Sequence, residues 1–219
     1  SLALAYPIEE VQLYLIDFKK GVEFKPYADA LLPHAKVVAI ESEREFGMSV
    51  LEGLDLELQR RGDSFRSAGV NSLAEYRQKT QEKTPRILLI VDEFQEFFIP
   101  EDHICRQANI LFERLVSKGR AFGIHILLGS QSLPAQLPRS TLDQMAVRVA
   151  LQCSQADSER ILAHDNPAAR LLSRPGEAIY NASNGLLEGN SLFQVAIFTE
   201  NDRNHYLKLI GEHMGARIS

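Results

Sequence analysis

The sequence predicts an α/β fold in which a mostly parallel β-sheet is covered by helices. Short aliphatic runs alternate with longer stretches that carry apolar residues at three- and four-residue steps, and no low-complexity linker separates them. The composition, 45% hydrophobic and 24% charged over 219 residues, is that of a globular chain. It excludes intrinsically disordered and collagen-like classes, and we expect one domain over residues 1–219.

Four aliphatic runs are expected to form the strands of the parallel sheet, and polar residues end each of them. The run at 87–91 is the most hydrophobic and is expected to be buried on both faces. In open parallel sheets, ligands bind outside the carboxyl ends of the strands, so these polar ends mark the expected site. The runs are 11–16 with Asp17, 36–40 with Glu41, 87–91 with Asp92-Glu93, and 124–128 with Gly129-Ser130-Gln131.

Helical spacing and turn residues predict the other elements. A long amphipathic helix over 43–66 is expected to break near Gly62, and a helix over 103–122 is expected to stop at Gly123. A more alternating fifth strand covers 146–151, and strands at 177–180 and 192–198 flank an Asn/Gly-rich turn, which predicts a hairpin at the sheet edge. Shorter helices are expected at 73–78, 158–163 and 202–214.

Charge, cysteines and hydropathy limit the possible functions. Cys105 and Cys153 lie far apart without metal-ligand spacing, which argues against a disulfide framework and a zinc site and favours a reducing cytosol. No apolar run has the length of a membrane span, and no signal peptide is evident. The net charge of −5 removes the simplest sign of nucleic-acid binding, a globally basic surface, but leaves room for a local basic patch.

The strongest chemical signal is a buried strand that ends in two adjacent acids. Asp92 can hold Mg²⁺ through water, and Glu93 can polarise a water molecule for attack on a γ-phosphate. The amide of Gln131 can contact both a phosphate oxygen and that water. The alternative interpretation is structural: acids at strand ends often cap helices, and Gln131 can be a loop residue bonded to the backbone.

The sequence resembles the FtsK/SpoIIIE branch of the FtsK–HerA ring ATPases, which includes the EccC/EssC ATPases of type VII secretion. The resemblance covers nearly all of the chain up to about Tyr180. The block that begins Gly119-Arg120 and ends at Gln131 is its most diagnostic part. The motifs that carry it are residues 15–24, 87–95, 119–131, 147–152 and 157–162.

This resemblance implies a RecA-like P-loop NTPase, a three-layer sandwich that uses ATP and Mg²⁺. Asp92 and Glu93 would be its Walker B pair, and Gln131 would sense the γ-phosphate. The ATP sites of a hexameric ring would be completed by an arginine from the neighbouring subunit. Arg120 is the first candidate, followed by Arg148 and Arg160, and the nucleotide-binding set is Asp17, Lys19, Ser130, Arg148 and Arg160.

One departure from the family pattern concerns the phosphate-binding loop. A P-loop requires Gly-x-x-x-x-Gly-Lys-Ser/Thr, and none of the 13 glycines precedes Lys-Ser or Lys-Thr. We therefore expect the C-terminal majority of a motor domain, without its first strand and P-loop, inactive alone and with an exposed sheet edge where that piece belongs. A degenerate P-loop in a natural protein is the competing explanation.

The leading hypothesis is an ATP-driven pump of double-stranded DNA, acting in the bacterial cytoplasm in cell division or chromosome segregation. Any membrane tether or membrane contact would lie in segments outside the sequence. A basic stretch, Arg77, Lys79, Lys83 and Arg86, could contact DNA or be a solvated loop. The alternatives are a type VII secretion ATPase with a protein substrate and a non-hydrolysing assembly module. His125 is expected to be a structural histidine in a buried strand.

Overall fold

The computed structural model describes residues 1–19, 23–40, 43–134 and 137–218, and its contacts group the chain into two compact units. The first unit comprises residues 1–130 and 199–219, and the second comprises residues 131–198. Glu41, predicted at the end of the second strand, lies outside the described residues, as do Lys20, Gly21 and Val22 of the first family motif.

The first unit contains a four-stranded parallel sheet in the order β2-β1-β3-β4. The strands match the four predicted aliphatic runs to within one residue at most ends, because each run is short, apolar and bounded by polar residues. They are β1 (Val11–Asp17), β2 (Ala35–Ala39), β3 (Arg86–Asp92) and β4 (Ile124–Leu128).

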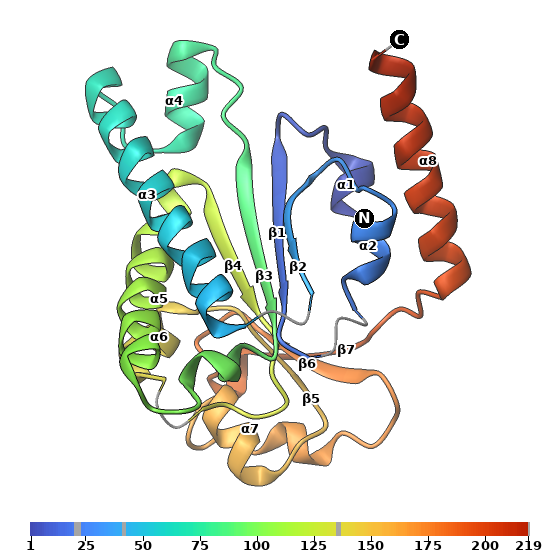
Figure 1. Cartoon of the computed structure of the whole chain (residues 1–219). Coiled ribbons are helices and arrows are strands. Elements are labelled where there is room, and N and C mark those ends of the chain that lie inside the picture. Colours follow the sequence, from blue (N-terminus) through green and yellow to red (C-terminus); the bar gives the residue numbers. More distant parts are fainter. Residues whose placement is uncertain (20–22, 41–42, 135–136, 219) are drawn as a thin grey trace. The chain divides into compact units, whose positions relative to one another are not determined.

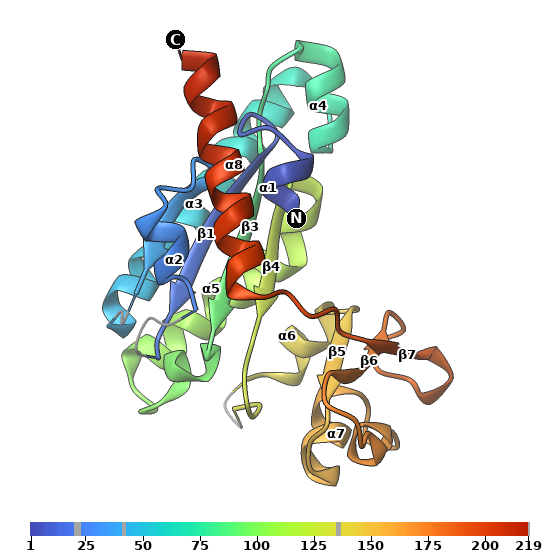
Figure 2. The ribbon, with the colours of Figure 1, turned by 90° about the vertical axis from the view of Figure 1, so that its right-hand side faces the viewer.

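Helices cover both faces of this sheet, so the first unit has the three layers of a RecA-like domain (Figure 1). One face carries α3 and α5, and the other carries α1, α2 and α8; Figure 2 shows α8 running along the sheet. Val11, Leu13 and Leu15 pack with Leu207 and Ile210 of α8 beneath this second layer. The helices of the unit are α1 (Leu2–Ala5), α2 (Lys25–Asp29), α3 (Arg44–Ala68), α4 (Leu73–Thr80), η1 (Phe94–Phe98), α5 (His103–Phe122) and α8 (Glu200–Ile218).

The predicted break of the long helix near Gly62 is wrong. Helix α3 continues unbroken to Ala68 and ends at Gly69, which adopts the left-handed conformation usual after a helix. The buried guanidinium of Arg61 anchors this part of the helix: it donates to Glu57 Oε1 (2.7 Å) and to the carbonyls of Phe122 (2.7 Å) and Pro85 (2.8 Å). These contacts outweigh the roughly 1 kcal/mol that a glycine costs inside a helix.

Strand β4 forms one edge of the sheet, pairing only with β3 among the described residues. Leu127 of this strand is 56% exposed. The prediction that His125 lies buried in this strand is wrong, because its side chain is exposed. A hydrophobic run therefore predicted the strand correctly but did not reveal that this strand lies at an edge.

The second unit is built on a three-stranded antiparallel sheet in the order β5-β6-β7. The predicted hairpin is present, but it pairs with the fifth strand in this separate sheet instead of extending the parallel one. Its second strand is 190–194 and not the predicted 192–198. The elements are α6 (Arg139–Gln144), β5 (Arg148–Leu151), α7 (Gln155–Ile161), η2 (Ala168–Leu171), β6 (Glu177–Asn181), η3 (Leu187–Gly189) and β7 (Asn190–Gln194).

No helix among the described residues combines the length and the apolar character needed to cross a membrane.

Candidate functional site

Two acids meet at the carboxyl edge of the parallel sheet. Asp17 ends β1, Asp92 ends β3, and the two residues are register partners on these neighbouring strands. Asp17 is only 1% exposed, although a carboxylate is costly to remove from water. The structure thus brings together two acids that the sequence places 75 positions apart at the edge where parallel sheets bind ligands.

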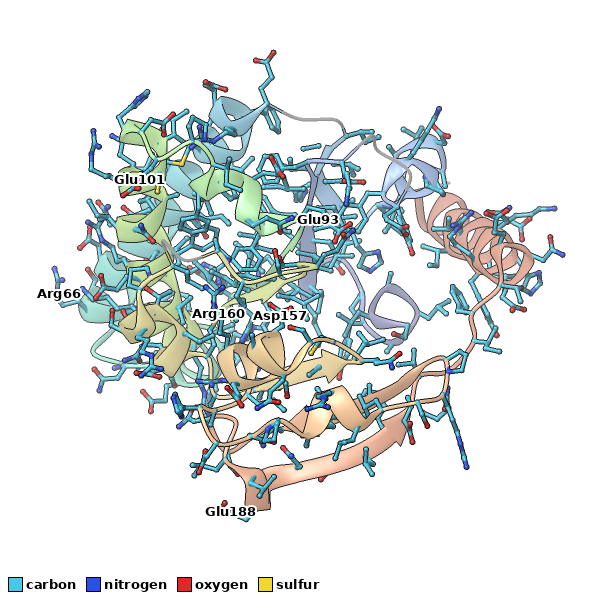
Figure 3. All side chains as sticks on the ribbon, turned by 90° about the horizontal axis from the view of Figure 1, so that it is seen from below. Arg66, Glu93, Glu101, Asp157, Arg160 and Glu188 are labelled. Atoms are coloured by element: carbon cyan, nitrogen blue, oxygen red, sulfur yellow. The ribbon has the colours of Figure 1, made fainter. Side chains whose placement is uncertain are left out.

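Glu93 leaves the strand in a different backbone conformation from Asp92. Its φ and ψ are 53° and 45°, in the left-handed region that non-glycine residues adopt at a cost. This turn leads into η1 and is held by the Phe94 N–H, which donates to the carbonyl of Gly129 (3.1 Å). The Glu93 side chain is buried, and Figure 3 labels it at the sheet edge. The sharp turn accounts for two adjacent acids that face different surroundings.

Lys19 binds both acid-bearing segments. Its ammonium lies 2.6 Å from Glu93 Oε1, and its backbone N–H donates to Asp17 Oδ1 (2.8 Å). The ammonium offsets part of the negative charge that three nearby acids create. The structure thus brings Lys19 together with Asp17 and Glu93, whereas a contact from Lys19 to nucleotide stays a prediction.

Gln95 is a site residue that sequence reasoning missed. Its amide donates to Glu93 Oε2, and its Oε1 accepts a hydrogen bond from the Ser130 hydroxyl (2.6 Å). Ser130 follows β4, so this amide links side chains at the ends of β3 and β4. The only signal in the sequence was the position of an amide two residues after Glu93.

The pKa of Asp92 is raised above its ordinary value. Loss of hydration is the largest cause, and the negative charges of Asp17, Glu93 and Glu23 act in the same direction; a backbone hydrogen bond from Glu93 opposes them. A cation placed beside Asp92 would relieve this repulsion. The carboxylate is thus suited to bind a positive ion.

The site fits a hydrated Mg²⁺ held by few protein ligands. Within the described ranges, no three His, Cys, Asp or Glu side chains form a cluster able to hold a metal alone. Mg²⁺ usually keeps several waters and binds one or two carboxylates together with substrate phosphates. Asp92, with its destabilised negative charge, is the carboxylate that would hold it.

Three packed aromatic rings support the segments that carry the site. Phe18, which lies between Asp17 and Lys19, packs edge-to-face on Phe97 of η1 at a centroid distance of 4.8 Å. Phe97 in turn packs edge-to-face on Phe112 of α5 at 5.4 Å. Because Phe97 and Phe112 are fully buried, the segments that carry Lys19 and Glu93 rest on a rigid apolar support.

Arg44 ties the first turn of α3 to the segment that follows η1. Its guanidinium donates to both carboxylate oxygens of Asp102 (2.8 and 2.9 Å) and to the carbonyls of Phe97 (2.9 Å) and Pro100 (3.1 Å). Asp102 also caps α5, accepting from the N–H of Cys105 (3.0 Å). The bonds from Arg44, followed by this cap, lower the pKa of Asp102 to about 2.

Arg120 does not join the acids. It is exposed on the last turn of α5, close to the start of β3, because the N–H of Ile87 donates to the carbonyl of Gly123 (2.8 Å). The strand from Ile87 to Asp92 spans about 16 Å at the usual rise per residue. Arg120 therefore lies near the amino ends of the strands, at the end of the sheet opposite to Asp92.

Near the amino ends of the strands, Arg120 lines a shallow basic pocket of about 390 Å³. Arg86, His125 and the first residues of α4 line the same pocket. Although His125 is exposed, the pocket walls remove part of its hydration, and this loss, followed by the charges of Arg86 and Arg120, lowers the pKa of its imidazole, which is therefore neutral at pH 7. The positive charge of the pocket therefore comes from its two arginines.

The remaining predicted site residues belong to the second unit. Gln131 is its first residue and is exposed. Arg148 is buried, and its guanidinium donates to the carbonyls of Leu142 and Leu162. Arg160 is exposed on α7, the helix that also carries Asp157 (Figure 3). Arg148 thus has a structural role within its unit, whereas Arg160 has a side chain open to solvent.

The parallel sheet between two helical layers has the fold of P-loop ATPase domains. The cytoplasmic domain of the Thermomonospora curvata type VII secretion ATPase EccC superposes with a TM-score of 0.76 at 23% identity, covering 95% of this chain and 25% of that one. The pCW3 conjugation coupling protein TcpA, solved with ATPγS, superposes with a TM-score of 0.77 at 22% identity. The match covers 94% of this chain and 58% of TcpA. At these identities the likeness shows the fold.

The sequence profile of the FtsK/SpoIIIE family matches residues 1–186, and the chain belongs to that family. ESX-5 protein EccC5 of Mycobacterium tuberculosis is 27% identical over 84% of this chain, and EccC of Geobacillus thermodenitrificans is 29% identical over 90%. DNA translocase FtsK of Streptococcus agalactiae is 27% identical over 76%. The chain spans 13%, 13% and 21% of these relatives, respectively.

Proposed function

We propose that these residues form the hydrolytic part of an ATP-driven translocase motor. The observation that carries this proposal is the group of side chains at the carboxyl edge of the sheet, where Asp17, Asp92 and Glu93 meet Lys19. Asp92 binds Mg²⁺ through water, and Glu93 orients the water that attacks the γ-phosphate. When bound, Mg²⁺ neutralises charge on the phosphates. The amide of Gln131 contacts the γ-phosphate, and Lys19 and Ser130 contact the nucleotide.

Arg120 acts on the nucleotide of a neighbouring copy in a hexameric ring. This proposal is supported by the position of Arg120 near the amino ends of the strands, which is too far from Asp92 for both residues to serve the same site. An exposed guanidinium beside Arg86 presents positive charge to a partner surface. In that position Arg120 stabilises the charge that develops in phosphoryl transfer. The exposed Arg160 is the second candidate for this role, and the buried Arg148 is the weakest.

The test uses the full gene product that carries these residues. Glu93→Gln should lower ATP turnover by about 100-fold or more because it removes the group that orients water. Binding of a fluorescent ATP analogue should survive this change. Arg120→Ala should also lower turnover, and mixing it with Glu93→Gln protein should restore some activity if the two residues act on different copies. Parental turnover in Glu93→Gln would overturn the assignment of Glu93.

The P-loop motif is absent from the 219 residues, so the chain by itself is expected to show no saturable ATP binding. Calorimetric titration of the 219-residue chain with Mg·ATP measures this directly. Tight binding would show that the residues present are sufficient to hold a nucleotide, and would remove the role that we give to a P-loop.

The polymer that the motor moves has two candidates, double-stranded DNA and a protein. Relatives of both kinds match the chain at similar identity, 27% and 29% for two EccC proteins and 27% for FtsK, so membership of the family fits either polymer. In the basic stretch proposed for DNA, Arg77 donates to the carbonyls of Thr84 (2.8 Å) and Glu10 (3.3 Å), so its guanidinium is engaged by the protein. We therefore place a secretion-type protein substrate ahead of DNA.

DNA dependence separates the two candidates. ATP turnover by the full gene product should be unchanged by added duplex DNA across a range of salt concentrations if the substrate is a protein. Stimulation by duplex DNA that weakens with salt would reverse the order of the candidates. Failure of any ATP turnover would instead favour the non-hydrolysing assembly module.

A further inference from the structure

The carboxylate of Glu93 is held at both of its oxygens. Oε1 accepts from the Lys19 ammonium (2.6 Å), and Oε2 accepts from the Gln95 amide. The Glu93 residue is 4% exposed, so these protein donors take the place of much of its hydration. The orientation of the carboxylate therefore depends on two side chains, one that follows β1 and one in η1.

Gln95 is itself fixed by a second bond. Its Oε1 accepts from the Ser130 hydroxyl (2.6 Å), while its Nε2 faces Glu93. A carboxylate cannot donate, so only this orientation of the amide satisfies both neighbours. The series Glu93–Gln95–Ser130 is thus a directional bridge in which each donor has one matching acceptor.

The bridge lies over a backbone connection between the same two strand ends. The Gly129 N–H donates to the Val91 carbonyl (2.8 Å), and the Phe94 N–H donates to the Gly129 carbonyl (3.1 Å). The main chain therefore sets the spacing between β3 and β4, and the side chains of Gln95 and Ser130 add orientation. A shift of Ser130 would be transmitted to Glu93 through a single amide.

We propose that Gln95 and Ser130 are positioning residues that set the orientation of the Glu93 carboxylate for attack by water. This inference rests on the proposed function and gives a role to Gln95, the last residue of the 87–95 motif, to which the sequence analysis assigned none. Without the bridge, the Glu93 carboxylate would lose the donor at its Oε2 and would be oriented less firmly about its χ angles. A misplaced base lowers the rate of the chemical step but leaves the binding of nucleotide unchanged.

Steady-state kinetics of the full gene product test the bridge. Gln95→Leu should lower kcat about 10- to 100-fold with little change in KM for ATP. Ser130→Ala should lower kcat to a similar extent, and any rise in its KM would report the contact that we propose between Ser130 and the nucleotide. The double variant should be no slower than the slower single variant, because both changes break one bridge. Ser130→Thr keeps the hydroxyl and should keep most of the turnover. Gln107→Leu, on the exposed face of α5, is the matched control and should behave as the parent.

The outcome can be separated from that of the proposed function. If Glu93→Gln is inactive but Gln95→Leu has parental kcat, the bridge is wrong and the role of Glu93 stands. If Glu93→Gln has parental turnover, the proposed function itself fails. Additive effects of Gln95→Leu and Ser130→Ala would also contradict the bridge, because they would show two independent contributions.

The bridge can also be tested without an activity assay, by NMR spectroscopy of the 219-residue chain. In a ¹⁵N-resolved NMR spectrum, the Gln95 side-chain amide should be shifted downfield and protected from exchange because it donates to a carboxylate. Glu93→Gln and Ser130→Ala should both move this signal, whereas Ser130→Thr should leave it in place. A Gln95 amide with the shift and exchange rate of an exposed glutamine would overturn the inference.

Discussion

Asp17 and Asp92 lie opposite each other on neighbouring parallel strands, at the same edge of the sheet. Asp17 is almost fully buried, and loss of hydration together with the nearby negative charges raises the pKa of Asp92. The folded chain therefore concentrates negative charge where it is least hydrated. An arrangement that destabilises the protein without its ligand is typical of a binding site.

Replacement of Asp92 by Asn should stabilise the 219-residue chain. Because the folded-state pKa is raised, the charged carboxylate opposes folding once the pH rises through that value, and Asn removes the charge. We expect Tm to rise by about 1–4 °C at neutral pH. The gain should vanish below the ordinary pKa of 3.8, where the parent is also protonated.

Calorimetric melting of parent and Asp92→Asn chains at several pH values checks this result. Asp63→Asn, at a side chain that is 75% exposed, is the control and should leave Tm unchanged at every pH. In the full gene product the same Asp92→Asn change should abolish Mg²⁺-dependent turnover. A lower Tm for Asp92→Asn at neutral pH would show that its charge does not oppose folding.

Arg44→Met should destabilise the chain in a pH-dependent manner. Arg44 and the α5 cap hold the pKa of Asp102 at about 2, below its ordinary 3.8. A depressed pKa stabilises the folded state above pH 3.8 and loses this effect as the pH falls toward about 2. The stability difference between parent and Arg44→Met should therefore be constant near neutral pH and shrink in this acid range.

Urea unfolding at a series of pH values measures that difference. Asp102→Asn is the matched control, because Asn is also a good helix N-cap but has no charge to titrate. Its stability should depend less on pH in the acid range than that of the parent. A difference between parent and Arg44→Met that stays the same down to about pH 2 would contradict the ion pair with Asp102.

Most of the fold could be predicted from the sequence because its elements are locally encoded. Helix α5 begins at an Asp cap and ends before Gly123, and the four parallel strands are short, mostly apolar runs. The acids at the strand ends were predictable for the same reason, since parallel strands place their carboxyl ends at one edge.

Features that depend on distant residues could not be predicted. The bond between Gln95 and Ser130 joins positions 35 residues apart, and that between Arg44 and Asp102 joins positions 58 apart. The three-stranded sheet was missed because a fifth strand that alternates in polarity fits either sheet. Helix α3 continues past Gly62 because Arg61 binds carbonyls of segments that only the tertiary fold brings near.

Loss of the Arg61 guanidinium should be strongly destabilising. Arg61 is 2% exposed and binds Glu57 and two backbone carbonyls. Arg61→Met therefore leaves two carbonyls without this donor and removes one of the two arginines that pair with Glu57. We expect a loss of about 3 kcal/mol in the free energy of unfolding. Arg66→Met is the control on the same helix: its pair with Asp63 is 81% and 75% exposed, and the change should cost less than about 0.5 kcal/mol. Urea unfolding that gave equal losses for the two variants would show that burial of Arg61 is not what matters.

Two glycines of α3 should respond in opposite ways to substitution by alanine. A Cβ atom at Gly47 would lie 2.8 Å from ring atoms of both Phe18 and Phe97, whereas one at Gly53 would meet nothing within 4 Å. Gly53→Ala should therefore stabilise the chain by about 0.5–1 kcal/mol through helix propensity alone. Gly47→Ala should cost about 1–3 kcal/mol, because the rings must move and overpacked cores are strained.

The displacement caused by Gly47→Ala should also reach the site. Phe18 lies between Asp17 and Lys19, so moving its ring shifts the segment from which Lys19 contacts Glu93. In the full gene product, turnover should fall for Gly47→Ala and stay at the parental value for Gly53→Ala, with stability followed by urea unfolding and turnover by phosphate release. Parental turnover in a folded Gly47→Ala protein would mean that the aromatic support does not set the position of Lys19, and that the acids are held by the strand register alone.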